Sequence, residues 1–126
     1  MGTFHASCTV ENIVDRSHCR QVDDLLVDTG SEFTWIANET LVAIGIAIEK
    51  KDSPFLMANG QTVTRSVGFA IIRYENMFTV DEVVFAEPGD LQLLGARTLE
   101  GLNLMIDAER KKLVAAGPMP AAPVIQ

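Results

Sequence analysis

The chain has 126 residues, 48% of them hydrophobic, which suits one domain with a single core. Its net charge of −7 disfavours a nucleic-acid partner, since such a partner requires a basic face. The longest apolar run, residues 41–48, is far shorter than the ~18 residues of a membrane-spanning helix, and residues 1–10 lack the pattern of a secretory signal. We therefore expect a soluble, cytoplasmic protein without a membrane segment.

The chain opens with a predicted β-hairpin. β-branched and aromatic side chains fill residues 3–14, turn formers occupy 15–18, and a second strand pattern covers 21–27. This second run ends in three consecutive apolar residues, which is typical of a strand that is buried on both faces. The pattern stops at Asp28, and a short apolar return follows over 33–36.

A short helix and a second hairpin are predicted next. Asn38 suits the N-cap of a helix that Gly45 ends, because apolar residues recur at helical spacing between them. The Ser-Pro pair at 53–54 indicates a loop. Residues 55–64 then contain Asn-Gly at 59–60, the strongest short-range signal for a hairpin turn.

The second half of the chain continues as strands separated by turns. Its predicted elements are strands over 67–74 and 77–85, a turn at 87–90, an apolar run at 91–94, a helical turn at 96–100, and a hairpin of 102–106 with 112–115. The prolines after residue 117 predict a flexible extended tail, which gives a domain over 1–117 and a tail over 118–126. Many short strands favour an all-β fold, either closed or sandwiched.

The most unusual residue is Asp28, a carboxylate directly after a buried strand, where its charge is costly to desolvate. Thr29 and Gly30 follow with a hydroxyl and a residue that permits close backbone approach. An ordinary turn would also explain an isolated Asp-Thr-Gly. Residues 26–31 (LVDTGS), however, resemble the active-site signature of aspartic proteases, and residues 93–96 (LLGA) resemble the second signature of that family.

The order and spacing of the two signatures resemble retropepsin-like (retroviral-type) aspartic proteases, including the small bacterial single-domain members, over residues 3–114. The Asn-Gly hairpin lies between the signatures, where the family has its flap. The resemblance implies an all-β fold, a closed and mostly antiparallel barrel with one or two short helices. It also implies an endopeptidase that uses neither a metal nor another cofactor.

In this family, two Asp side chains hold a water between them. One carboxylate accepts a proton from the water, and the other donates a proton to the scissile carbonyl. This chain has one Asp-Thr-Gly and is too short for two lobes, so the resemblance implies a C2 homodimer in which Asp28 meets its symmetry mate. The expected partners are a second copy of the chain and a peptide or protein substrate.

By resemblance, Asp28, Thr29 and Gly30 form the catalytic set, with Thr29 bridging to the partner chain and Gly30 admitting the substrate backbone. The Ser31 hydroxyl is expected to bond either the Asp28 carboxylate or its own turn backbone. The only tryptophan in the chain and the leucine before the second signature suit the core as well as a binding groove. The expected substrate-binding residues are Ser31, Glu32, Phe33, Trp35, Asn59, Gly60 and Leu93.

Other interpretations stay open. A non-catalytic peptide-binding or dimerisation module of the same fold would share these motifs. A metal-dependent hydrolase would use Asp23, Asp24 and Asp28, but the first two point to opposite faces of a strand, so no metal site is predicted. Cys8 and Cys19 are too few for a disulfide scaffold and are expected to be unpaired thiols.

Overall fold

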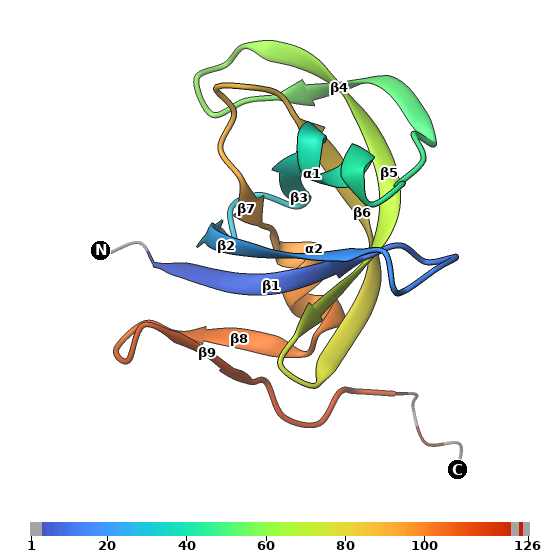
Figure 1. Cartoon of the computed structure of the whole chain (residues 1–126). Helices are drawn as coiled ribbons and strands as arrows, with labels where there is room; N and C mark the ends of the chain where they lie inside the picture. The colour runs from blue at the N-terminus through green and yellow to red at the C-terminus, as the bar shows by residue number, and fades with distance from the viewer. Residues whose placement is uncertain (1–3, 122–123, 125–126) are drawn as a thin grey trace.

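The computed structural model describes residues 4–121 and 124 (Figure 1). Residue 3, where the first predicted strand begins, and residues 122, 123, 125 and 126 of the predicted tail lie outside the described residues. The described part contains nine strands and two short helices: β1 (His5–Glu11), β2 (Cys19–Val27), β3 (Thr34–Ala37), α1 (Asn38–Ala43), β4 (Lys50–Leu56), β5 (Thr62–Tyr74), β6 (Met77–Ala86), β7 (Leu93–Leu94), α2 (Ala96–Gly101), β8 (Leu104–Asp107) and β9 (Lys112–Ala115).

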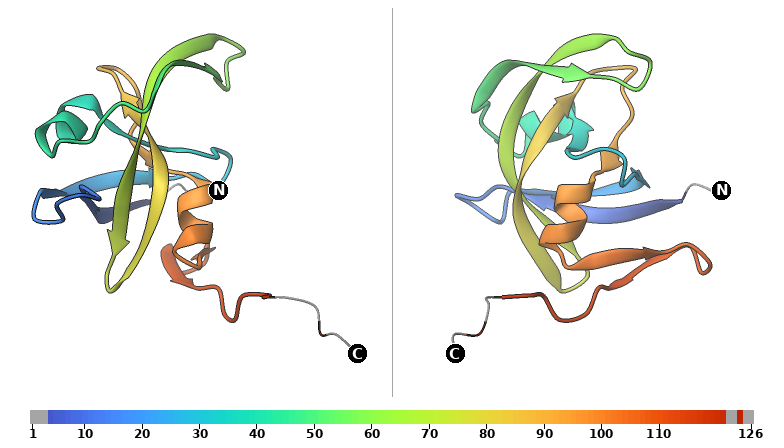
Figure 2. Two further views of the ribbon diagram at one scale, coloured as in Figure 1. Left: turned by 90° about the vertical axis from the view of Figure 1, so that its right-hand side faces the viewer. Right: turned by 180° about the vertical axis from the view of Figure 1, so that it is seen from behind.

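Seven strands form one sheet in the order β1-β2-β7-β3-β6-β5-β4, and β1 makes a further pairing with β5. Strands β8 and β9 form a separate hairpin. The pairings β2–β7 and β3–β6 are parallel, whereas the others are antiparallel. The long β5–β6 ribbon runs steeply across the direction of β1 and β2 (Figure 2). The all-β class and the two short helices predicted from the sequence are therefore confirmed.

The main core lies between the strands and the two helices, and it forms because alternate side chains of each strand face inward. Burying each large apolar side chain stabilises the fold by roughly 1.5–3 kcal/mol. The fully buried large side chains of this core are Val10, Leu25, Ile36, Leu41, Ile72, Val83 and Leu94.

A second, smaller cluster packs against the β4–β5 hairpin, and we call it the hairpin cluster. Partly buried side chains on its edge come from β2, β4 and β5 and from the loops beside them. Its buried members are Trp35, Val67, Val84, Ala86 and Leu93. Strand β7 contributes to both clusters. Leu94 belongs to the main core, and its neighbour Leu93 belongs to the hairpin cluster.

The structure corrects the loop predicted at residues 53–54. Ser53 and Pro54 lie inside β4, and Pro54 pairs with Thr64 of β5. Strand β4 is at one end of the sheet order, and an edge strand tolerates a proline because the missing N–H would face away from the sheet. Within the apolar run at 91–94, Leu93 and Leu94 form the short strand β7 and pair with β2 and β3.

The first helix is confirmed, but Asn38 is not its N-cap. Ala37 occupies that position without a side-chain cap bond, and Asn38 is the first helical residue. The chain leaves β3 directly into α1, so no free residue separates the two elements. Gly45 follows the C-cap Ile44 with φ of +76°, a conformation that favours glycine after a helix.

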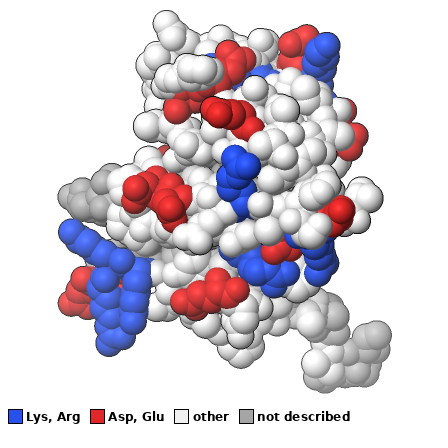
Figure 3. All heavy atoms as spheres, viewed as in Figure 1, with Lys and Arg blue, Asp and Glu red and all other residues white. Residues whose placement is uncertain are grey.

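Acidic and basic side chains are interspersed on the face drawn in Figure 3. The largest group of basic side chains on that face lies at its lower left, with acidic side chains next to it. None of the helices in residues 4–121 is long and apolar enough to cross a membrane.

Candidate active site

Asp28 leaves the end of β2 at the point where the two sequence signatures meet. Leu26 and Val27 of β2 pair in parallel with Leu93 and Leu94 of β7. The Asp28 N–H extends this ladder, because it donates to the Leu94 carbonyl at 3.0 Å. The Asp28 backbone is therefore fixed by the sheet, although its side chain is only half-buried.

A tight turn over residues 28–31, the Asp28 loop, orients the carboxylate. The Gly30 N–H donates to Asp28 Oδ1 at 2.9 Å, and the Ser31 N–H donates to the Asp28 carbonyl at 3.2 Å. A Cβ at position 30 would lie only 3.1 Å from Asp28 Oδ1, so glycine suits this close approach. The Ser31 hydroxyl donates to the Phe33 carbonyl at 3.0 Å, which matches the backbone alternative rather than the carboxylate alternative.

The glycine of the second signature is required by close packing. A Cβ at Gly95 would collide with the Phe33 carbonyl and crowd that of Glu32, both of which are backbone groups. Past this glycine, Ala96 N–H donates to the Ser31 carbonyl at 2.7 Å and Arg97 N–H donates to the Glu32 carbonyl at 3.1 Å. The start of α2 is thus bonded to the residues that follow Asp28.

A chain of buried hydrogen bonds lies beneath the Asp28 loop, and the sequence patterns did not reveal it. The Gly95 N–H donates to Thr34 Oγ1 at 3.0 Å. The hydroxyls of Thr34 and Thr98 bond each other, and Thr98 Oγ1 donates to Asp81 Oδ2 at 2.9 Å. Because Thr98 uses its proton on Asp81, Thr34 is the donor in the bond between the hydroxyls. Both threonines are fully buried, so these bonds satisfy groups that water cannot reach.

The Asp28 carboxylate borders a groove of about 650 Å³. Seven of the ten predicted site residues line this groove, namely Asp28, Gly30, Ser31, Glu32, Phe33, Trp35 and Leu93, whereas Thr29, Asn59 and Gly60 do not. Sequence reasoning missed the rest of the lining, which comes from the β4–β5 hairpin at residues 55–58 and from the chain before β7 at residues 89–91.

Aromatic rings form one side of the groove. The ring centroid of Phe55 lies 5.6 Å from that of Phe33 and 5.3 Å from that of Trp35, both in edge arrangements. The Arg97 guanidinium lies 5.0 Å from the Phe33 ring centroid. Trp35 and Leu93 are nearly buried, and both still line the groove, so each is a core residue and a groove residue at once.

The turn of the β4–β5 hairpin, residues 57–61, faces the groove with its first half. Met57 and Ala58 line the groove, while Asn59 and Gly60 are exposed at the tip. The turn is held by its own bonds: Met57 N–H to the Gln61 carbonyl at 2.8 Å, and Gly60 N–H to the Met57 carbonyl at 2.9 Å. Gly60 has φ of +86°, as the Asn-Gly signal predicts.

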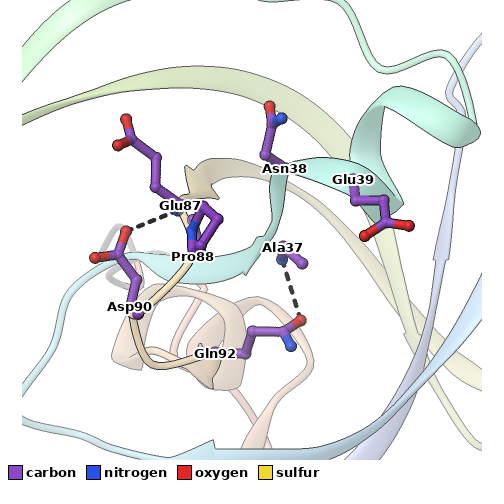
Figure 4. A pocket seen from close by; sticks show the side chains of 9 residues that line it. Ala37, Asn38, Glu39, Glu87, Pro88, Asp90 and Gln92 are labelled. Atoms are coloured by element: carbon purple, nitrogen blue, oxygen red, sulfur yellow. Dashed lines mark hydrogen bonds between the residues drawn. The ribbon is translucent and has the colours of Figure 1, made fainter.

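The turn at residues 87–90 also lines a smaller cavity of about 380 Å³, and most of the residues around this cavity are labelled in Figure 4. Asp90 borders both hollows, and its Oδ2 accepts the Glu87 N–H at 2.8 Å. Across the smaller cavity, Gln92 Oε1 accepts the Ala37 N–H at 3.1 Å. Hydrogen bonds from Arg65 hold the pKa of Asp90 below its usual value, more than burial raises it, so Asp90 is charged near neutral pH.

Besides Asp28, the possible reactive groups are the two cysteines and the side chains that could bind a metal. Within residues 4–121, no three His, Cys, Asp or Glu side chains gather closely enough to hold a metal ion. Cys8 and Cys19 are unpaired thiols, as predicted. Burial raises the pKa of Cys8 to about 12, so that thiol is protonated and unreactive at neutral pH.

The comparison with solved structures defines the architecture as retropepsin-like. The matching structure is the retroviral protease-like domain of Ddi1 from Leishmania major, with a TM-score of 0.59. The match covers 91% of this chain and 89% of that chain at 14% sequence identity. The sequence matches no family model and no curated protein. At this identity the likeness shows the fold, and it confirms the retropepsin-like architecture expected from the two signatures.

Proposed function

We propose that the protein is an aspartic endopeptidase that cleaves extended peptide segments with a water activated between two Asp28 carboxylates of a homodimer. The observation that carries this proposal is the position of Asp28. Its backbone is bonded to the central strand β7, and its side chain borders a groove with a largely apolar lining. A carboxylate in such a place can act as a general base toward a bound water.

The carboxylates that one groove contains support the proposed homodimer. Asp28, Glu32 and Asp90 are the acidic residues of its lining. Asp90 is bound by Arg65, and Glu32 is exposed. A second Asp28 from a symmetry mate is therefore the group that would complete the pair, with the exposed Thr29 near the two-fold axis.

The groove suits an extended peptide with apolar side chains. Its aromatic side would contact a side chain of the substrate through Phe33, Trp35 and Phe55. The β4–β5 hairpin would act as a flap, because backbone groups beside its turn can bond the main chain of a peptide laid beneath it. Met57 and Ala58 are the hairpin residues placed to make these contacts.

Replacing Asp28 with Asn tests the assignment directly. The change keeps the size of the side chain and its acceptor for the Gly30 N–H, but it removes the general base. We expect peptide hydrolysis to fall by at least about 100-fold with an unchanged unfolding temperature. Asp24→Asn is the matched control, because Asp24 is exposed and its φ of 56° is one that asparagine tolerates. Equal turnover in the Asp28→Asn protein would refute the proposal.

Mixing the two proteins tests the shared site. Heterodimers of wild-type and Asp28→Asn chains should be inactive, so added mutant chain should lower the activity per wild-type chain, measured in peptide hydrolysis. Activity should also fall on dilution through the dimer dissociation constant, recorded by sedimentation in parallel. An activity per wild-type chain that changes neither with added mutant chain nor with dilution would indicate a monomeric site. Peptide binding without cleavage by the wild type would instead indicate a non-catalytic module.

A further inference from the structure

Arg65 joins two segments that border the groove, because it forms ion pairs with both Asp90 and, at 3.8 Å from Nη1 to Oε2, Glu87. Arg65 of β5 donates from Nε to Asp90 Oδ2 at 2.7 Å and from Nη2 to Asp90 Oδ1 at 2.9 Å. The side chains are only 14% and 13% exposed, so this is a two-point pair that is largely shielded from water. It connects the β4–β5 hairpin to the turn at residues 87–90, and its two residues are 25 positions apart in the sequence.

The strand register directs Arg65 toward the groove side of the hairpin. Arg65 pairs with Ser53, and two residues away Val63 pairs with Phe55. Alternate residues of a strand share a face, so Arg65 projects from the same face as Phe55, which lines the groove. A third nitrogen, Nη1, donates to the Thr64 carbonyl at 2.8 Å and fixes the guanidinium to its own strand.

The turn at residues 87–90 has few other attachments. Glu87, Pro88 and Gly89 are exposed, and its internal bonds run between Glu87 and Asp90. These bonds set the shape of the turn but do not fasten it to the hairpin. The turn leads into Leu91, which lines the groove and is 67% exposed. The sheet holds the two ends of this wall, through the β5–β6 pairing before it and β7 after it, and Arg65 is the side chain that bonds the turn between them to the hairpin.

We propose that Arg65 is a positioning residue that sets the width of the groove, by tying the β4–β5 hairpin to the wall formed by residues 87–91. The effect on substrate rests on the proposed function, since a substrate in the groove would contact both sides. The tie itself does not depend on catalysis. Without Arg65, the Asp90 carboxylate would lose its partner and move toward water, and the wall would move with it.

A second ion pair supplies a matched control. Arg73 donates from Nε to Glu11 Oε2 at 2.7 Å and also joins distant segments, β5 and β1. Neither Arg73 nor Glu11 lines the groove. Arg65→Met and Arg73→Met therefore remove the same group from the same strand and the same kind of pair. They differ in whether the pair joins segments that border the groove.

Hydrogen exchange of the whole protein tests the tie without any assumption about activity. Arg65→Met should speed amide exchange at residues 57–61 and 87–91 by about tenfold, while Arg73→Met should leave both segments unchanged. Arg65→Lys, which keeps the charge but loses the two-point geometry, should give an intermediate result. It also serves as the test variant if Arg65→Met does not fold. Unchanged exchange in these segments, or an equal change in Arg73→Met, would overturn the proposal.

Peptide kinetics test the consequence for substrate. Arg65→Met should raise KM by about tenfold and change kcat by less than about threefold, because a loosened wall weakens binding more than it alters Asp28. Arg73→Met should leave KM unchanged at a temperature where both variants are folded. A fall in kcat alone would refute the positioning role. If the wild type cleaves no peptide, the proposed function fails, and hydrogen exchange still decides whether Arg65 ties the two sides together.

Discussion

The Asp28 loop and the turn of the β4–β5 hairpin both border the groove, but their hydrogen bonds differ in where the partners lie. The Asp28 loop is bonded to residues outside itself, through the Asp28 N–H to Leu94 and through the Ser31 carbonyl to Ala96. The hairpin turn at residues 57–61 is bonded to itself, apart from the strands that carry it. The chain therefore places its half-buried carboxylate on a fixed support, whereas the hairpin turn that also borders the groove has only local hydrogen bonds.

This difference has a physical consequence for motion. Opening the Asp28 loop requires breaking sheet bonds and exposing the buried threonines beneath it, whereas the hairpin turn can move as a unit on β4 and β5. A proposed active site benefits from both properties, because a reacting group must be held in place while a cover must admit the peptide. Paired substitutions in the two segments can test whether the contrast is real.

The largest effect is expected from Gly95→Ala, which adds a methyl group where backbone already occupies the space. The new Cβ would collide with the Phe33 carbonyl, and no flexible side chain is available to move away. We expect a loss of about 3 kcal/mol or more in the free energy of unfolding, with activity lost in proportion. Urea denaturation followed by circular dichroism would measure it, and a loss below about 1 kcal/mol would mean that the loop is not tightly supported.

A smaller loss is expected from Thr34→Val, which has nearly the same shape but lacks the hydroxyl. The buried Gly95 N–H would lose its acceptor, and such a group costs about 1–3 kcal/mol. Thr62→Val is the control, because Thr62 is exposed on β5 and surface changes are usually within about 0.5 kcal/mol. Equal stabilities of the two variants in urea would show that the buried threonine chain does not support the Asp28 loop.

The sequence predicted the parts of this contrast that depend on local patterns. Asp28 and Gly30 stood out because a charged residue and a glycine interrupt a buried strand. The Asn-Gly pair predicted the hairpin turn, since few other residues adopt its backbone angles. Resemblance indicated the second glycine, whereas its physical reason, the close approach of the Phe33 carbonyl, is visible only in the folded chain.

The parts that the sequence did not reveal depend on distant residues. Thr34 and Thr98 lie 64 residues apart, and each looks like an ordinary strand or helix residue until the two hydroxyls meet. The ion pair of Arg65 could not be predicted from the sequence, because its partner Asp90 lies in the segment Glu-Pro-Gly-Asp, which indicates only a turn. The loop predicted at Pro54 was wrong, because a strand tolerates proline at the edge of a sheet. The order of all the strands decides which strand is at the edge.

The smallest effect on stability is expected from Gly60→Ala, which repeats the Gly95 substitution at the hairpin turn. No atom lies within 4 Å of a Cβ built at Gly60, so its cost is confined to the φ of +86°. A left-handed alanine costs about 1–2 kcal/mol, and the less flexible unfolded chain offsets about 0.4–1 kcal/mol of this. We therefore expect the free energy of unfolding to fall by about 1.5 kcal/mol or less in urea titration. The local strain should nevertheless shift the hairpin turn, and with it Met57 and Ala58, which line the groove. Because Asp28 does not move, we expect KM for a peptide to rise by a few-fold and kcat to stay nearly unchanged. A large global loss of stability, comparable to that of Gly95→Ala, would show that the hairpin turn is part of the folded core and would remove the contrast between the two segments.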